Sequence, residues 1–138
     1  MTTTEMRDPK QIEDAAIDFV VERERAEGRE ARDTRGEPGA VADLVSGGRV
    51  IEVKACGTSS RGYELWLGCC QYVAARDDPA HFWLYLVENV AQGDPARFQL
   101  LRLGGHRLQE LLERAKEQRY WTVPVPVRVY DQLAAEQG

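Results

Sequence analysis

The sequence predicts an α/β domain in which a mixed central sheet is flanked by helices. Apolar residues recur at helical spacing over residues 10–27, and two β-rich runs flank Gly47-Gly48. Residues 81–90 form the most apolar run of the chain, which is typical of a buried strand. The chain of 138 residues is long enough for one core, so residues 9–138 are expected to form a single domain.

The first helix is expected to follow a flexible tail over residues 1–8. Asp8 can accept a hydrogen bond at the helix N-terminus, and Pro9 suits the first turn. From there, the apolar side chains of residues 10–27 gather on one helical face. Acidic and basic residues alternate over residues 22–35, and this alternation is typical of a solvated surface.

A β-hairpin is expected next, after a polar loop over residues 29–39. The diglycine lies between its two strands, where a tight turn is needed. In the second strand, Ile51 and Val53 point to one face, and Glu52 and Lys54 point to the other. The strand therefore has one apolar face and one charged face.

The remaining elements follow from the same signals and from two prolines near the end of the chain. Residues 120–133 contain Pro124 and Pro126, which cannot donate to a strand ladder, so this run can form only an edge strand or an extended wrap. In chain order, the other expected elements are a short strand over 63–67, a helix over 69–77, the strand over 81–90, a strand over 97–103 and a helix over 106–119.

Composition narrows the class of protein. Hydrophobic residues make up 43% of the chain and charged residues 30%, which excludes collagen-like and wholly disordered chains. No apolar run approaches the roughly 18 residues of a membrane span, and the N-terminus lacks a secretory pattern, so a cytoplasmic protein is expected. The net charge of −5 argues against a free-standing DNA-binding module, but not against an enzyme that holds cations with carboxylates.

The hairpin also carries the residues that point to chemistry. Asp43 lies on one arm, and Glu52 and Lys54 lie on one face of the other. Two carboxylates can bind a hard cation such as Mg²⁺, which polarises a phosphodiester, and a nearby lysine can orient water or stabilise developing charge. The alternative is that Glu52 and Lys54 are an ordinary pair on the solvent side of an amphipathic strand.

Three stretches of the chain resemble a known family. They are AAIDFVVERERAEGR (15–29), ADLVSGGRVIEVKACG (42–57) and HFWLYLVENV (81–90). In this order they resemble the PD-(D/E)XK, or restriction-endonuclease-like, superfamily. Within it, they are similar to the domain of unknown function at the C-terminal end of the NO VEIN protein. The resemblance implies an αβββαβ core with the site at the hairpin.

The resemblance also implies roles for individual residues. Asp43 and Glu52 would hold Mg²⁺ or Mn²⁺, and Lys54 would be the catalytic lysine. An acidic residue on the first helix often completes such sites, which here implies Asp18 or, one turn further on, Glu22. The alternative for either residue is a solvated charge on the flank of the helix.

The second helix supplies one more candidate, Gln71, since a polar residue of that helix faces the site in related nucleases; the alternative is a plain surface position. The implied function is metal-dependent hydrolysis of phosphodiester bonds in DNA, in defence against foreign DNA or in nucleic-acid processing. The alternative is a non-catalytic module of the same fold that binds a protein partner or nucleic acid. Further expected partners are a second copy, paired through a strand near 123–129, and a larger protein that supplies targeting to DNA.

Overall fold

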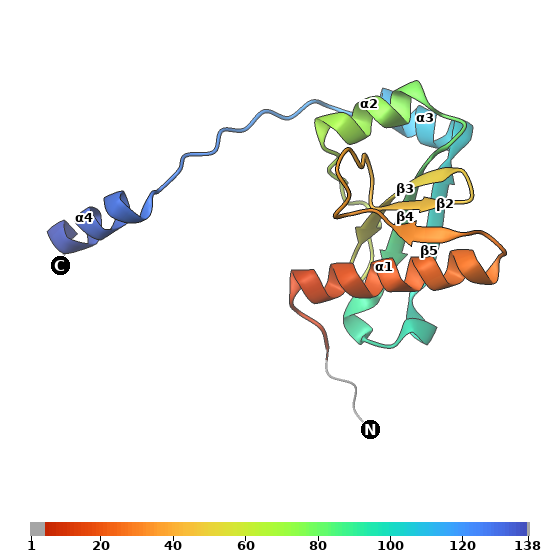
Figure 1. Ribbon diagram of the computed structural model, residues 1–138, viewed down its shortest axis with the longest axis horizontal. Helices are drawn as coiled ribbons and strands as arrows, with labels where there is room; N and C mark the ends of the chain where they lie inside the picture. Colours follow the sequence, from red (N-terminus) through yellow and green to blue (C-terminus); the bar gives the residue numbers. More distant parts are fainter. Residues whose placement is uncertain (1–4, 138) are drawn as a thin grey trace.

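The structure, a computed structural model, describes residues 5–137 and has the expected mixed α/β architecture (Figure 1). Its five strands lie in the order β1-β2-β3-β4-β5, with β3 and β4 parallel and all other neighbours antiparallel. In chain order the elements are α1 (Pro9–Ala26), β1 (Ala31–Asp33), β2 (Leu44–Ser46), β3 (Arg49–Ala55), α2 (Cys69–Asp77), β4 (Phe82–Glu88), the short 3-10 helices η1 (Val90–Gln92) and η2 (Pro95–Arg97), β5 (Gln99–Gly104), α3 (Gly105–Glu113) and α4 (Val127–Gln137).

Helix α1 covers one face of the sheet. The Asp8 side chain accepts a hydrogen bond from the Lys10 N–H and Pro9 occupies the first turn, as predicted. Neither α1 nor any other helix within residues 5–137 is both long and apolar enough to cross a membrane. The core on this face contains Ala16, Ile17 and Val20 of α1 together with Leu44, Ile51, Val53, Tyr85, Val87, Val90 and Phe98.

Helices α2 and α3 cover the opposite face of the sheet. Since strand residues alternate between faces, Glu52 and Lys54 project to this side, in register with Leu84 and Leu86 of β4. A sheet covered on both faces buries polar strand residues as well as apolar ones. The core on this face contains Ala42, Ala75, Phe82, Leu84, Leu86, Leu108 and Leu112.

The β2–β3 hairpin forms at the predicted diglycine. Ser46 pairs with Arg49, so Gly47 and Gly48 are the two turn residues, and both have positive φ. A two-residue turn of this hand requires positive φ at both positions, which glycine adopts without steric cost.

Two predictions between α1 and α2 are wrong. The loop expected over residues 29–39 contains β1, a three-residue strand in which only Ala31 is buried, so its sequence shows no apolar alternation. The strand expected over residues 63–67 is irregular and pairs with no strand of the sheet. Because β3 and β4 are parallel, the chain must cross from one end of the sheet to the other between them, and residues 63–67 belong to that crossover.

The C-terminal part also departs from the prediction. Helix α3 ends at Glu113 rather than at residue 119, because Leu112 is the last side chain that packs against the core. The run expected as an edge strand or an extended wrap stays outside the sheet, and its irregular part stops at Pro126. There α4 begins, and the Pro126 carbonyl accepts a hydrogen bond from the Tyr130 N–H at 2.9 Å. Pro124 and Pro126 cannot donate to a strand ladder, and proline is well suited to the residues that precede or begin a helix, which fits the start of α4 after Pro126.

The N-terminal tail expected over residues 1–8 lies partly outside the described residues. Of the part that the structure describes, the Met6 N–H donates a hydrogen bond to the Ala91 carbonyl at 2.8 Å. This contact joins the segment before α1 to η1.

Candidate functional site

Asp43 lies immediately before β2 and faces β3. The hairpin register pairs Leu44 with Ile51, so the next position places Asp43 opposite Glu52. Asp43 Oδ2 accepts a hydrogen bond from the Val53 N–H at 2.9 Å, which orients the carboxylate on the neighbouring strand. The fold of the hairpin thus brings together the two carboxylates that the sequence singles out.

The carboxylate of Glu52 is buried, and one of its two oxygens has no hydrogen-bond partner among the described residues. Its side chain is only 5% exposed, and Oε2 lies 3.1 Å from Lys54 Nζ. The other oxygen, Oε1, is buried and has no hydrogen-bond partner among the described residues. Burying a carboxylate oxygen without a hydrogen bond costs free energy. At Oε1 the protein therefore leaves a negative charge without a donor or cation to stabilise it.

The environment of Glu52 favours its neutral form. Burial raises the pKa of Glu52, and the negative charge of Asp43 raises it further. Lys54 acts in the opposite direction, but the pKa still rises from its usual range to about 7. A raised carboxyl pKa beside a second carboxylate is typical of a functional site.

A pocket of about 310 Å³ opens beside Asp43. Three elements contribute polar side chains to its wall: α1 supplies Glu13, the loop after β1 supplies Arg35, and α2 supplies Gln71. The rest of the wall is the small apolar segment 40–42. The pocket therefore has polar groups from both helices and one carboxylate of the hairpin.

The positive charge of Arg35 is compensated by ion pairs with three acidic residues. Its Nη1 lies 2.8 Å from Asp14 Oδ1 and 3.3 Å from Glu13 Oε1, and its Nη2 lies 2.7 Å from Asp33 Oδ2. These contacts join α1 to the segment after β1 and hold Glu13 at the pocket wall.

The structure does not bring Asp18 or Glu22 to this pocket. Both side chains are exposed, and neither residue lines the pocket. Glu13 is the acidic residue of α1 that does, and sequence reasoning missed it. A signal existed, because Glu13 lies four residues before the buried Ile17 and therefore continues the apolar stripe of the helix.

Gln71 has a structural task in addition to its place in the pocket wall. Its Oε1 accepts a hydrogen bond from the Gly68 N–H at 2.9 Å, at the N-terminus of α2. The side chain thus stabilises the first turn of the helix in a position where a donor N–H would otherwise be unpaired.

The residues present fit a divalent cation held by few protein ligands. No group of three or more His, Cys, Asp or Glu side chains suited to a metal ion occurs within residues 5–137. Mg²⁺ commonly takes only one or two protein carboxylates and keeps several waters. Asp43 and the unpartnered Oε1 of Glu52 meet that requirement, and a cation would compensate the buried negative charge.

A second buried glutamate lies on the α1 side of the sheet. Glu24 is fully buried and accepts hydrogen bonds from Arg29 (2.8 Å to each oxygen), Ser46 (3.2 Å), Tyr85 (3.1 Å) and Arg102 (3.2 Å). Burial raises the pKa of Glu24, but the hydrogen bonds from Arg29 and Tyr85 outweigh it and lower the pKa to about 2. Glu24 and Arg29 belong to the alternating charges expected to be solvated, so that expectation is wrong for this pair.

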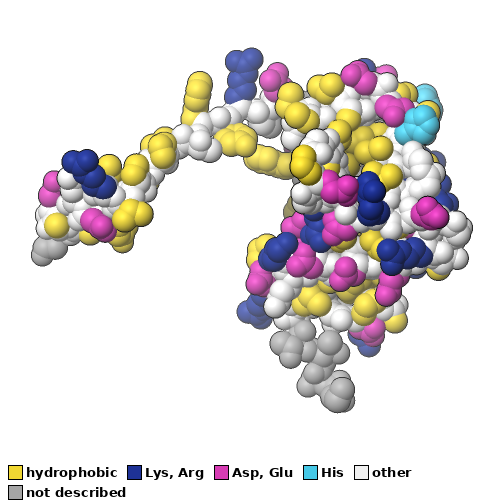
Figure 2. Space-filling view, in the orientation of Figure 1, with side chains coloured by type: hydrophobic (Ala, Val, Ile, Leu, Met, Phe, Trp, Pro, Cys, Tyr) yellow, Lys and Arg dark blue, Asp and Glu magenta, His cyan; other side chains and the backbone are white. Residues whose placement is uncertain are grey.

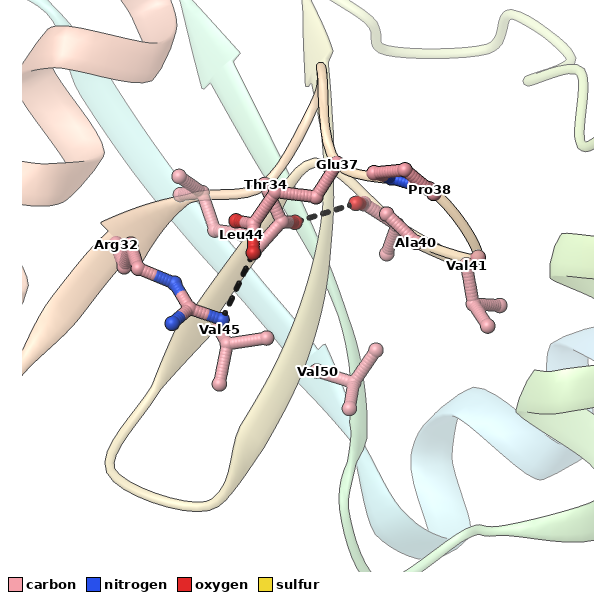
Figure 3. A pocket seen from close by; sticks show the side chains of 11 residues that line it. Arg32, Thr34, Glu37, Pro38, Ala40, Val41, Leu44, Val45 and Val50 are labelled. Atoms are coloured by element: carbon pink, nitrogen blue, oxygen red, sulfur yellow. Dashed lines mark hydrogen bonds and ion pairs between the residues drawn. The ribbon is translucent and has the colours of Figure 1, made fainter.

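Another hollow, of about 290 Å³, lies over β1 and β2 (Figure 3). Its wall is mainly aliphatic, with Val41, Val45 and Val50 around it. The charged groups at its rim satisfy each other, because Arg32 Nη2 lies 3.3 Å from Glu37 Oε1. This hollow offers no unsatisfied polar group and is not the candidate site.

Comparison with known proteins identifies a family. No curated protein and no solved structure is similar enough to count as a match. The family described as "Protein NO VEIN, C-terminal" matches residues 12–101, a stretch that runs from α1 into β5 and contains Glu13, Asp43, Glu52 and Lys54. The chain therefore belongs to the family of the NO VEIN C-terminal domain.

Proposed function

We propose that the NO VEIN C-terminal domain of this chain is a metal-dependent nuclease that hydrolyses phosphodiester bonds in DNA, with its site at Asp43, Glu52 and Lys54. The observation that carries the proposal is the buried Glu52 carboxylate, which has one unpartnered oxygen next to a second carboxylate and a lysine. The element order α1-β1-β2-β3-α2-β4 supports it, because an αβββαβ order is what the restriction-endonuclease-like superfamily implies.

Each residue of the site has a distinct task in this proposal. Asp43 and Glu52 would hold Mg²⁺ or Mn²⁺, and the Val53 N–H keeps the Asp43 carboxylate oriented. A bound cation of this kind polarises a phosphodiester and lowers the pKa of a coordinated water. Lys54, 26% exposed and held 3.1 Å from Glu52, can orient the attacking water or stabilise negative charge on the phosphate.

Two observations favour a different function, a non-catalytic module of the same fold. The described residues gather no third acidic side chain suited to a metal, and the start of α2, Cys69 and Cys70 after the N-cap Gly68, has no carboxylate. In that case Glu52 and Lys54 would be a buried structural pair, and the surface would bind a protein or nucleic acid without cutting it.

Cleavage of DNA separates the two functions. The full chain is incubated with supercoiled plasmid or linear single strands in the presence of Mg²⁺, Mn²⁺ or EDTA. We expect cleavage with either metal and none with EDTA. Lys54→Ala should lower the rate by about 100-fold or more, the usual effect of removing one group that stabilises transition-state charge.

Lys10→Ala is the matched control for the lysine variant. Lys10 also pairs with a carboxylate, Asp14, at 3.2 Å, but on the exposed surface of α1. Its substitution should leave the rate of cleavage unchanged. Equal cleavage by the parent and the Lys54→Ala variant would contradict the proposed site, and a folded parent that neither cuts DNA nor binds Mn²⁺ would support the non-catalytic module.

A further inference from the structure

The last 24 residues of the described chain, 114–137, form an arm beyond α3. Every residue from Arg114 to Gln137 is exposed, and the arm leads away from the body (Figure 1). Hydrophobic side chains nevertheless follow its whole length, including α4 (Figure 2). The largest of them are Tyr120, Trp121, Tyr130 and Leu133, and Trp121 is 92% exposed. Apolar exposure on this scale is typical of a segment that binds another surface.

The middle of the arm is preorganised as an extended strand. The segment Val123-Pro-Val-Pro126 alternates a β-branched residue with proline. The pyrrolidine ring fixes φ of Pro124 and Pro126, and a residue that precedes proline is confined to extended conformations, so Val123 and Val125 are restricted as well. The segment therefore loses little conformational entropy when it binds as a strand.

The same alternation gives the segment hydrogen-bond donors on one edge only. In an extended strand, successive backbone N–H groups point to opposite edges. The N–H groups of Val123 and Val125 point to one edge, and the opposite edge carries Pro124 and Pro126, which have no N–H. Such a strand can complete the edge of a sheet, and it blocks the addition of a further strand.

The body offers a matching edge at β5. This strand is last in the sheet order and six residues long, and among residues 5–137 it pairs with β4 alone. It is also apolar, with Leu100, Leu101 and Leu103, and Leu101 is 40% exposed. The edge at the other end of the sheet is less suited, because β1 has three residues and two of them are exposed and charged. A long apolar edge strand readily pairs with another chain.

We propose that the Val123–Pro126 segment of one copy pairs with β5 of a second copy, and that two copies exchange their arms around a twofold axis. The extended residues 116–126 can span about 35 Å, more than the radius of a domain of this size, so the segment can reach a neighbouring molecule. In the single chain the arm points away from its own β5 edge (Figure 1). A reciprocal exchange covers both exposed edges at once, and twofold closure limits the assembly to a dimer.

The test is the mass of the full chain in solution, measured by sedimentation over a range of concentrations. The parent should reach twice its 15.6 kDa mass as the concentration rises. The variant Val123→Pro/Val125→Pro keeps the extended conformation but removes both donors, so it should stay monomeric. The matched control Pro124→Ala leaves the paired edge intact and should still dimerise. Thermal unfolding monitored by circular dichroism should be the same for the monomeric parent and for both variants, because the arm is exposed in the single chain.

A second variant probes the other side of the interface. Leu101→Lys places a charge on the exposed edge of β5 and should weaken dimerisation as strongly as the loss of the arm donors. A parent that stays monomeric at millimolar concentration would overturn the proposal, and so would a dimer that survives Val123→Pro/Val125→Pro. Neither result depends on metal binding or on cleavage.

Discussion

Glu24 and Glu52 are both glutamates buried against the central sheet, on opposite faces and with different partners. Glu24 accepts five hydrogen bonds from four residues, two of them arginines. Glu52 has one lysine contact and an oxygen without a partner among the described residues. The same side chain accordingly has a pKa lowered to about 2 in one place and raised to about 7 in the other.

This difference in partners distinguishes Glu24, a structural carboxylate, from Glu52, a candidate metal ligand. Around Glu24 the protein supplies partners for both carboxylate oxygens, so the ionised form stabilises the fold; in this network the atom left without a partner among the described residues is a donor, Arg102 Nε. Around Glu52 the protein supplies a second carboxylate and a single cation, so the ionised form is destabilised by the fold that holds it. A bound cation would compensate the charge of a site of the second kind, and this is why we place the proposed function there.

Removing the charge of Glu24 should produce the largest loss of stability. Glu24→Gln leaves Arg29 and Arg102 without their buried partner, and breaking a buried ion pair in this way costs about 3–5 kcal/mol. Chemical denaturation at neutral pH measures the free energy of unfolding directly. A loss below 1 kcal/mol would show that the network does not hold α1 to the sheet.

Removing the charge of Glu52 should change the free energy of unfolding in the opposite direction, towards greater stability. At pH 8 the ionised Glu52 is held in a fold that disfavours it, so Glu52→Gln is expected to raise the free energy of unfolding by about 2–3 kcal/mol in EDTA. The measurement is the same denaturation series. A variant less stable than the parent at pH 8 would mean that the ion pair with Lys54 dominates and that the site is structural.

The pH dependence of stability should also distinguish the two glutamates. The folded pKa of Glu24 lies below the unfolded value of 4.5, so its contribution is present above pH 4.5 and is lost as pH falls through about 2. The folded pKa of Glu52 lies above that value, so its contribution is present below pH 4.5 and is lost as pH rises through about 7.

In EDTA, the parent should therefore lose on average about 1 kcal/mol per pH unit from this group between pH 4.5 and 7. Subtracting the profile of Glu52→Gln isolates that slope. Identical profiles for the parent and the variant would show that Glu52 ionises normally in the folded chain.

The smallest expected effect concerns the α1 residue that accompanies the site. Glu13→Gln should weaken Mn²⁺ binding about tenfold, the usual effect of changing a side chain next to the ligands, because Glu13 lines the pocket beside Asp43. Asp18→Asn should have no effect, since Asp18 is exposed and outside the pocket wall. Titration of both variants with Mn²⁺ compares their affinities. A larger loss of affinity in Asp18→Asn than in Glu13→Gln would favour Asp18, the residue that the family resemblance implies.

The elements that the sequence predicts best are those with a strong local signal. The diglycine turn fixes the hairpin, and strand alternation then places Glu52 and Lys54 on one face. By contrast, β1 is short and charged, and residues 63–67 have a β-like sequence without a strand to pair with. Pairing between distant segments decides both cases, and no local pattern contains that information.

For the candidate site, strand alternation predicts which hairpin residues share a face, but it does not predict which acidic residue of α1 lies at the pocket wall. Glu13 and Glu24 both lie on the line of Ile17 and Val20 along α1, so a polar residue within an apolar stripe was the available signal. Whether such a residue is fully buried between two arginines, as Glu24 is, or lies exposed at the wall of a pocket beside Arg35, as Glu13 does, depends on the strands and loops packed against it.

The most direct test of the contrast between the two glutamates is a calorimetric titration of the parent and Glu52→Gln with Mn²⁺ at pH 8. We predict one Mn²⁺ per chain for the parent and no measurable binding for the variant, which keeps the shape of the side chain but lacks its charge. Binding of equal affinity and stoichiometry in both proteins, or no binding to the folded parent, would contradict the claim that Glu52 is left unsatisfied in order to hold a cation.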